Sequence, residues 1–349
     1  MIVPSKRGRR LSPCSARCRS WLRIRGRACP MGLKKRERAK GMGRRNRRGG
    51  RERPGPAGFL IVDKPKGQTS HDVVDAARRW LGIRRVGHLG TLDPQATGVL
   101  PLVIRGATKL APFFGSGRKS YVGTVRLGAV TDTLDGEGEI LKRYEGVLPD
   151  EAAVRDALAN FVGEIEQIPP MFSAVKLDGV ALYKLARQGE EVEREAKKVV
   201  VHSLELTRFD SPDAEITVEC GSGTYVRTLA HDLGEVLGCG GYLSDLRRLQ
   251  SQPFGIEVAH SFEACEEAAR LGKMDDLLIP PEKGLEFPVI QLAAQGAERV
   301  ENGGDISPGT LERSRPGTRV TALGPEGRMI AILELRADRR LWPLRVLPA

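Results

Sequence analysis

The sequence lacks any long hydrophobic run: none of its 349 residues falls in a stretch approaching the roughly 20 apolar residues of a membrane-spanning helix. Its six cysteines include no Cys-x-x-Cys pair, and Cys14 and Cys18 have no matching second pair, so we expect neither a zinc site nor a disulfide scaffold. We find no secretory signal, Walker loop, dinucleotide fingerprint or set of metal ligands. These absences predict a cytoplasmic protein that needs no metal and no redox cofactor.

The positive charge of the chain is concentrated at one end. The formal net charge is +12, yet residues 1–56 carry 20 Lys and Arg against two acids, which leaves residues 57–349 at −6. We interpret residues 1–56 as a basic, disordered extension, with Met31 and Met42 as alternative translation starts. Any contact of the folded part with nucleic acid must therefore use local basic patches.

One stretch, residues 87–100, has the features of an active site. Asp93 is followed by Pro94, which favours an extended backbone at the aspartate. The glycines of this stretch allow sharp turns and the close approach of a ligand. The apolar run that follows, Val99 to Ile104, is typical of a buried strand. The residues predict a carboxylate held in a loop that enters a core strand, although a simple Asp-Pro turn gives the same pattern.

The pattern Gly-His-x-Gly-x-Leu-Asp-Pro-x-Ala-x-Gly-x-Leu in this stretch resembles the catalytic loop of the bacterial tRNA pseudouridine-55 synthases of the TruB type. Val-Asp-Lys-Pro-x-Gly-x-Thr-Ser at 62–70 and Thr-Asp-Thr-x-Asp at 131–135 resemble further segments of that family. The resemblance implies isomerisation of uridine-55 in the T-arm loop of tRNA, on a flipped-out base. It also implies a monomer whose partner is tRNA and which uses no cofactor.

The resemblance assigns the catalytic roles to three residues. Asp93 acts as a nucleophile at C1′ or as the base that starts glycal formation. Burial alone would neutralise this carboxylate, so Arg227, which matches the arginine of Gly-Thr-Tyr-x-Arg-Thr, is expected to reverse the effect and keep it ionised. Tyr121 is expected to stack on the uracil and to take the C5 proton, although a strand aromatic in the core is the alternative.

Four further residues are expected to bind the substrate. By the same resemblance, His88 fills the place of the flipped base, with a histidine that only caps the loop as the alternative. Tyr225 and Leu246 match positions that contact the substrate, and a buried core leucine is an equally good interpretation of Leu246. Lys64 follows the predicted strand 58–63 and is expected to touch phosphate unless it is a solvated turn lysine.

The order of predicted elements favours an α+β fold with a mixed, mainly antiparallel sheet and flanking helices, because strands and helices alternate irregularly. The resemblance implies a pseudouridine synthase catalytic domain over 57–285. It also implies an RNA-gripping insertion over about 169–198, where an aromatic lies among basic residues. These residues are Lys176, Tyr183, Lys184, Arg187, Arg194, Lys197 and Lys198. Residues 286–349, with short apolar runs between glycine turns, predict a small β-barrel, and its place in the chain resembles the C-terminal PUA-type domain of the family, which implies RNA binding.

Two other functions remain open at the level of sequence. The catalytic subunit of a guide-RNA-dependent pseudouridine synthase shares the aspartate loop, but the insertion argues for an enzyme that grips RNA by itself. A non-catalytic tRNA-binding or refolding module would not need Asp93, Tyr121 and Arg227 together.

Overall fold

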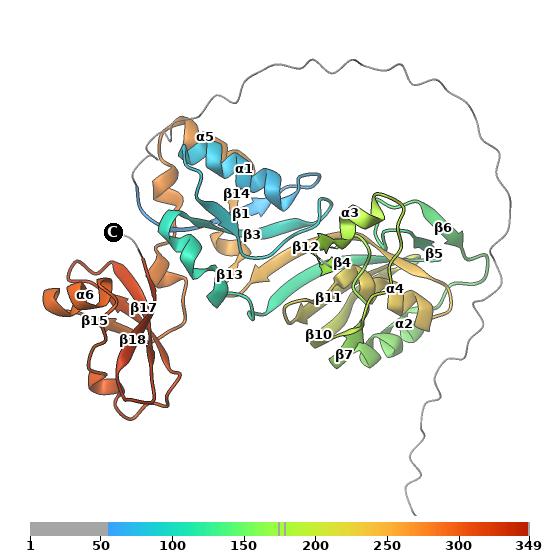
Figure 1. Cartoon of the computed structure of the whole chain (residues 1–349). Coiled ribbons are helices and arrows are strands. Elements are labelled where there is room, and N and C mark those ends of the chain that lie inside the picture. Colours follow the sequence, from blue (N-terminus) through green and yellow to red (C-terminus); the bar gives the residue numbers. More distant parts are fainter. Residues whose placement is uncertain (1–54, 174, 178, 348–349) are drawn as a thin grey trace, which may run out of the picture. The chain divides into compact units, whose positions relative to one another are not determined.

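A ten-stranded sheet carries the elements around Asp93 in the computed structural model, which describes residues 55–173, 175–177 and 179–347 (Figure 1). The predicted basic extension thus lies, up to residue 54, outside the described residues. In pairing order the strands are β14 (His260–Ser261), β1 (Gly58–Lys64), β3 (Thr97–Ile104), β12 (Gly241–Ser251), β4 (Lys119–Leu127), β11 (Asp213–Cys220), β10 (Lys197–Asp210) and β7 (Gly163–Gln167). In addition, β2 (Val86–His88) pairs with β3, and β13 (Phe254–Gly255) pairs with β12.

The sheet is mixed and mainly antiparallel, as the sequence predicted. Among its described pairs, β1 with β14 and β3 with β12 are parallel, and the others are antiparallel. The parallel β3–β12 contact is short, with Arg247 opposite Thr97 and Arg248 opposite Gly98. This contact places the end of the predicted catalytic loop against β12. The α+β fold class is therefore confirmed.

Four helices cover the sheet. α1 (Ser70–Leu81) and α5 (Phe262–Arg270) lie side by side, with the rings of Trp80 and Phe262 4.9 Å apart, and α5 packs on β1 (Figure 1). α4 (Val226–Val236) packs on β12 and β4, and α2 (Glu151–Leu158) packs on β10. Between helices and sheet lies a core of fully buried aliphatic side chains, which includes Leu60, Leu100, Val125 and Ile216.

The start of α1 shows how local sequence prepares the site. Thr69 caps this helix and forms a capping box with Asp72. The hydroxyl of Ser70 is therefore free for another contact, described below. The helix ends at Gly82, whose φ of 65° suits the left-handed conformation of a C-terminal cap.

Several short elements complete the part of the chain before residue 286. Residues Arg105–Phe113 form a 3-10 helix, with Pro112 near its end. Because Pro112 has no N–H, it cannot donate the backbone hydrogen bond that would continue an α-helix there. Two hairpins are formed by β5 (Ala129–Thr131) with β6 (Ile140–Arg143), and by β8 (Lys176–Leu177) with β9 (Val180–Ala181), which leads into α3 (Leu182–Ala186).

The barrel predicted over 286–349 is the one fold expectation that needs correction. The described residues there form a four-stranded sheet in the order β15 (Val289–Gln291), β16 (Arg319–Leu323), β17 (Met329–Leu335) and β18 (Leu341–Val346), with α6 (Ala294–Glu301) against β17 and β18. A barrel needs its outer strands to pair with each other, and β15 and β18 do not pair within the described residues. The core between this four-stranded sheet and α6 includes the buried side chains of Val300, Val320 and Leu333.

None of the helices in the described residues combines the length and the apolar character needed to cross a membrane.

Candidate active site

Asp93 lies in the loop between β2 and β3, as the sequence predicted. The loop turns back at Asp93, whose carbonyl accepts a hydrogen bond from the Ala96 N–H at 3.1 Å. Gly98 then passes directly against β12 with a φ of +100°. A Cβ atom at this position would lie 2.1 Å from the carbonyl oxygen of Arg248, so only glycine fits. The loop can thus enter the sheet beside β12 without displacing either strand.

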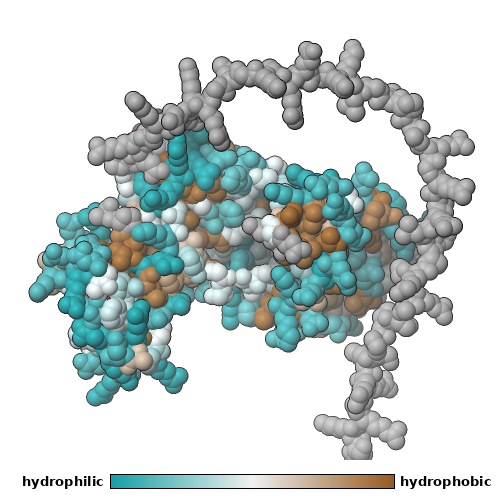
Figure 2. Space-filling view, viewed as in Figure 1, coloured by the Kyte–Doolittle hydropathy of each residue, from teal (hydrophilic) through white to brown (hydrophobic). Residues whose placement is uncertain are grey.

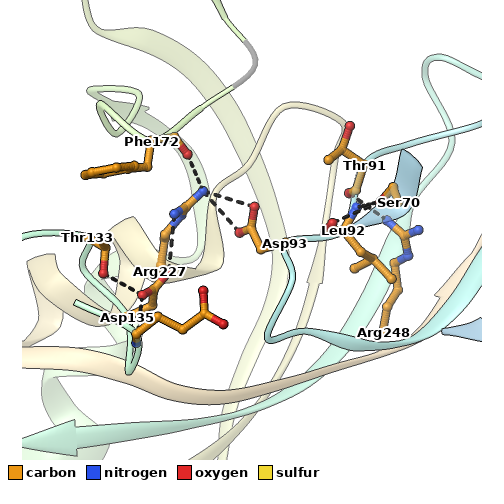
Figure 3. Close-up of polar contacts among 10 residues, drawn as sticks. Ser70, Thr91, Leu92, Asp93, Thr133, Asp135, Phe172, Arg227 and Arg248 are labelled. Carbon is orange, nitrogen blue, oxygen red and sulfur yellow. Dashed lines mark hydrogen bonds and ion pairs between the residues drawn. The ribbon is translucent and has the colours of Figure 1, made fainter. Parts of the chain in front are cut away.

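Side chains from three other elements hold the backbone of this loop, and Figure 3 shows two of them, Ser70 and Arg248. The hydroxyl of Ser70, at the start of α1, donates to the Leu92 carbonyl at 2.9 Å and accepts from the Leu92 N–H at 2.8 Å. Arg248 on β12 donates from Nη2 to the Gly90 carbonyl and from Nη1 to the Thr91 carbonyl, at 3.2 and 3.4 Å. The loop backbone is therefore fixed on the N-terminal side of Asp93 before any substrate arrives.

Lys64 is the third anchor, and this is a correction to the expected phosphate contact. Its side chain is fully buried, and its ammonium donates to the carbonyls of Pro65, Gln68 and Pro94 at 2.7 to 3.0 Å. Burial lowers the pKa of Lys64 to about 8, against the opposing attraction of Asp93. An ammonium whose three protons are already donated to backbone carbonyls cannot also reach a phosphate. Lys64 therefore supports the loop at Pro94 instead of touching RNA.

Arg227 joins two carboxylates at the site (Figure 3). Its Nη2 lies 3.2 and 3.1 Å from the two carboxylate oxygens of Asp93, and its Nη1 lies 3.3 Å from Asp135 Oδ2. Nη2 also donates to the Phe172 carbonyl at 2.7 Å. The Arg227 side chain is 5% exposed and the Asp93 side chain 35% exposed, so the arginine lies behind the aspartate and leaves one side of it open.

The electrostatics of Asp93 differ from the expectation in one respect. Burial raises the pKa of the Asp93 carboxyl, Arg227 opposes this effect, and the negative charge of Asp135 adds to it. The net direction is upward, so Arg227 moderates the effect of burial but does not reverse it. The physical reason is that Arg227 divides its charge between two carboxylates, Asp93 and Asp135.

Tyr121 and Leu246 lie on the adjacent strands β4 and β12. Arg248 pairs with Tyr121 across these strands, and Leu246 pairs with Gly123. Both Tyr121 and Leu246 are buried, 6% and 7% exposed, and both belong to the main core. The Tyr121 hydroxyl lies against the Arg248 guanidinium, and burial raises the pKa of this phenol. The raised pKa keeps Tyr121 in the neutral phenol form, which is a poor proton acceptor, so this environment suits stacking better than proton removal.

His88 and Tyr225 lie on different elements, at the end of β2 and directly before α4. The Nδ1 of His88 accepts from the Gly90 N–H at 3.4 Å, and burial and the charge of Arg248 lower the pKa of the imidazole. His88 is therefore a neutral, flat ring on the loop that carries Asp93. Tyr225 precedes α4, and the side-chain amide of Gln167 bonds both its N–H and its carbonyl, at 3.0 and 3.3 Å. Arg227 follows two residues later, so Gln167 also helps to fix the start of the helix that presents the arginine.

The described residues contain no group of three or more His, Cys, Asp or Glu side chains arranged to hold a metal ion.

Comparison with known proteins identifies the family. Residues 78–226 match the model of the TruB family pseudouridylate synthase N-terminal domain, and residues 227–286 match the tRNA pseudouridylate synthase B C-terminal domain. A tRNA pseudouridine synthase B of Geobacter sulfurreducens is 45% identical over 291 residues, which cover 82% of this chain and 95% of that protein. The chain belongs to the TruB family.

Other TruB-family proteins and solved structures agree with this assignment. The tRNA pseudouridine synthase B of Ruegeria pomeroyi is 44% identical over 83% of this chain and 95% of its own length. A solved Cbf5-Nop10-Gar1 complex contains a chain of similar fold, with a TM-score of 0.62 and 25% identity over 83% of this chain and 84% of that one. An H/ACA RNP bound to a substrate RNA containing 2′-deoxyuridine has a TM-score of 0.63 at 22% identity, over 84% and 85% of the two chains, which shows the fold alone.

Three residues of this TruB-family site were not assigned a role from the sequence. Asp135 lies in the Thr-Asp-Thr-x-Asp segment, where it was visible only as one of several loop carboxylates. Arg248 was not singled out in the sequence, and Ser70 was visible only as the last residue of the segment at 62–70. One signal for Arg248 was present in the sequence: the arginine lies in a strand that otherwise alternates between apolar and polar residues. A charged side chain that is buried there needs hydrogen-bonding partners.

Proposed function

We propose that this TruB-family chain isomerises uridine to pseudouridine in tRNA, at uridine-55 in the loop of the T-arm. The observation that carries the proposal is the Asp93 carboxylate, which is partly open to solvent and lies 3.1 Å from a buried arginine on a loop with anchored backbone. The names of the relatives that are 41 to 49% identical, all tRNA pseudouridine synthase B, support the choice of tRNA as substrate.

The reaction moves one bond and consumes nothing. The N1–C1′ bond of uridine breaks, the uracil turns in the site, and a C5–C1′ bond forms while the C5 proton moves to the released nitrogen. Asp93 either attacks C1′ or removes the proton that starts glycal formation, and both routes need the ionised carboxylate. The positive charge of Arg227 balances the negative charge of the Asp93 carboxylate, on the face of Asp93 that is turned away from solvent.

The remaining site residues hold the flipped nucleotide. Tyr121 stacks on the uracil as a neutral phenol, and Leu246 closes the pocket beside it, two positions from Arg248 on β12. His88 fills the space that the base leaves in the RNA stack, for which a neutral imidazole is better suited than a charged one. Tyr225 borders the same pocket at the start of α4.

Outside the pocket, the insertion at 169–198 grips the RNA. Tyr183 and Arg187 are both exposed on this segment, with the guanidinium 5.7 Å from the centre of the tyrosine ring, a pair that suits an unstacked base or a phosphate. Residues 57–285 form the catalytic domain, and residues 286–349 a PUA-like RNA-binding domain. We infer a cytoplasmic monomer that uses no metal.

The test is to incubate the purified full chain with an unmodified tRNA transcript and no other RNA. Mass analysis after cyanoethylation should find one pseudouridine, at position 55. A transcript with cytidine at this position should remain unmodified. Activity only after addition of a guide RNA would favour the guide-dependent alternative, and tight binding without product would favour a binding module. The identity to tRNA pseudouridine synthase B is 41 to 49%, against 22 to 25% for the ribonucleoprotein structures, which favours the guide-free result.

A further inference from the structure

Two positively charged side chains converge on one point of the catalytic loop. Gly90 has a φ of +146° and no side chain. The position that a Cβ atom would take there is 3.7 Å from Cε of Lys119 and 3.7 Å from Nη1 of Arg248. The Lys119 side chain and the Arg248 guanidinium therefore both lie beside Gly90, three residues before Asp93.

Neither cation is paired with a carboxylate within the described residues. Arg248 is fully buried and donates to the carbonyls of Gly90, Thr91 and Val99. The hydrogen bond found for the Lys119 ammonium is a long one, 3.3 Å, to the Gly117 carbonyl. Burial and the charge of Arg248 both lower the pKa of Lys119, so the two cations repel each other across this space. A bound anion would relieve that repulsion.

Lys119 lies on the same strand as Tyr121, one of the residues proposed to line the substrate pocket. Lys119 and Tyr121 are two residues apart on β4, so their side chains leave the same face of the sheet. His88 lies on the other side of Gly90, whose N–H it binds. Lys119 therefore borders the place where the flipped nucleotide meets its neighbours in the RNA chain.

We propose that Lys119 binds a backbone phosphate of the substrate RNA directly beside the flipped nucleotide, with buried Arg248 adding a fixed positive charge behind it. The absence of a side chain at Gly90 leaves room for the phosphate to approach. Arg248 itself makes no contact, because it is fully buried and donates to three carbonyls. The inference rests on the proposed function and assigns it one phosphate contact that the sequence did not indicate.

The test measures RNA binding separately from isomerisation. In an Asp93→Asn background, which holds the RNA without turnover, binding of a T-arm stem-loop is measured from about 50 to 200 mM KCl. Lys119→Gln should reduce the slope of log affinity against log salt by about 0.7 to 0.9, the value for one phosphate contact. It should weaken binding about tenfold at the lowest salt. Lys119→Arg should retain the slope.

A matched control comes from the same strand. Arg126 is at the other end of β4 and forms a bidentate pair with Asp213 at 2.7 and 2.8 Å. Arg126→Gln removes the same charge from the same strand and should leave both slope and affinity unchanged. An equal fall in slope for Arg126→Gln and Lys119→Gln would overturn the proposal, because it would show a general charge effect. An unchanged slope for Lys119→Gln would also overturn it.

A second measurement changes the RNA instead of the protein, and so does not depend on the variant folding. One methylphosphonate linkage, which is neutral, replaces the phosphate on either side of the target uridine in turn. The Asp93→Asn protein should lose about tenfold in affinity for one of the two RNAs. Lys119→Gln should lose nothing further with that RNA, since the two changes remove one contact. Additive losses, or no loss with either RNA, would contradict the assignment. If the Asp93→Asn protein does not bind the T-arm at all, the proposed function fails, and this contact with it.

Discussion

The loop that carries Asp93 and the insertion at 169–198 form contrasting parts of the same site. In the loop, the backbone of Gly90 through Pro94 is bound by Arg248, Ser70 and Lys64 from three different elements. Among the described residues, the insertion is joined to the site through the Phe172 carbonyl, which accepts from Arg227, whereas the bond from Arg194 to the Pro169 carbonyl lies within the insertion itself. It exposes apolar side chains beside α3 (Figure 2), among them Leu177 on β8 and Val180 on β9, and Tyr183 is exposed on α3 itself.

This difference in how the backbone is held corresponds to two different tasks, positioning the carboxylate and gripping the RNA. A carboxylate that acts on C1′ must be held to within a fraction of an ångström, which requires a backbone that does not adjust when RNA binds. A surface that grips a folded RNA gains affinity from exposed aromatic and basic groups, whose contacts the partner completes. Substitutions in the loop should therefore affect stability and turnover, whereas substitutions in the insertion should affect RNA affinity.

The largest effect is expected from Arg248→Met, which removes the charge but keeps much of the volume. Three carbonyls lose this donor, that of Val99 in a buried contact and those of Gly90 and Thr91 in part-buried ones, which should lower the free energy of unfolding by about 3 to 5 kcal/mol and reduce turnover as the loop loosens. Denaturant unfolding and the rate at saturating tRNA measure the two effects. The adjacent Arg247, which is 40% exposed and pairs with Asp63 at 2.7 Å, is the control: Arg247→Met should cost less than about 1 kcal/mol. Equal stability for the two variants would refute the role of Arg248.

An intermediate effect is expected from Asp135→Asn. Wild-type activity needs ionised Asp93, and because the pKa of Asp93 is raised, the acid limb of the rate should lie at higher pH than an ordinary aspartate would give. Asp135→Asn removes a negative charge that contributes to this rise, so the acid limb of the pH–rate profile should move to lower pH. The maximum rate should fall about tenfold to a hundredfold, because Arg227 loses one of the two carboxylates that orient it.

The control for this variant is Asp132→Asn in the same loop, where the carboxylate is exposed and accepts from the Glu139 N–H at 2.9 Å. It should leave the profile in place. A shift of the acid limb to higher pH in Asp135→Asn would contradict the assigned electrostatics.

The smallest effect on the enzyme itself is expected in the insertion. The double variant Lys184→Gln, Arg187→Gln removes two exposed charges from α3 and the residue that follows it. We expect tRNA affinity to fall about tenfold at moderate salt, with the free energy of unfolding changed by less than about 0.5 kcal/mol and the rate at saturating tRNA unchanged. A lower saturating rate with normal affinity would show that the insertion belongs to the catalytic machinery after all.

Much of the fold could be predicted because its signals are local. The apolar runs of β1 and β3, the alternation of β4 and the capping residues of α1 indicate their structures without reference to the rest of the chain. The closed barrel was wrong because closure depends on whether β15 and β18 meet, which no local pattern determines.

The same distinction holds in the site. Asp93 was predictable because its glycines and proline are its neighbours in sequence. The role of Asp135 depends on Arg227, 92 residues away, and that of Arg248 depends on carbonyls about 150 residues away. Lys64 was misjudged because a lysine after a strand is usually solvated, and only the fold shows that three carbonyls surround it.

The central claim is that one ionised carboxylate, held on a rigid loop, performs the chemistry. Asp93→Asn tests it most directly, because the amide keeps the shape and the hydrogen-bonding capacity of the side chain but cannot act as nucleophile or base. We expect pseudouridine formation under single-turnover conditions to fall by at least about three orders of magnitude. The dissociation constant for tRNA should stay within a few-fold, since binding comes mainly from phosphate and shape contacts. Wild-type-like turnover by Asp93→Asn, or a loss of activity explained entirely by lost tRNA binding, would contradict the claim.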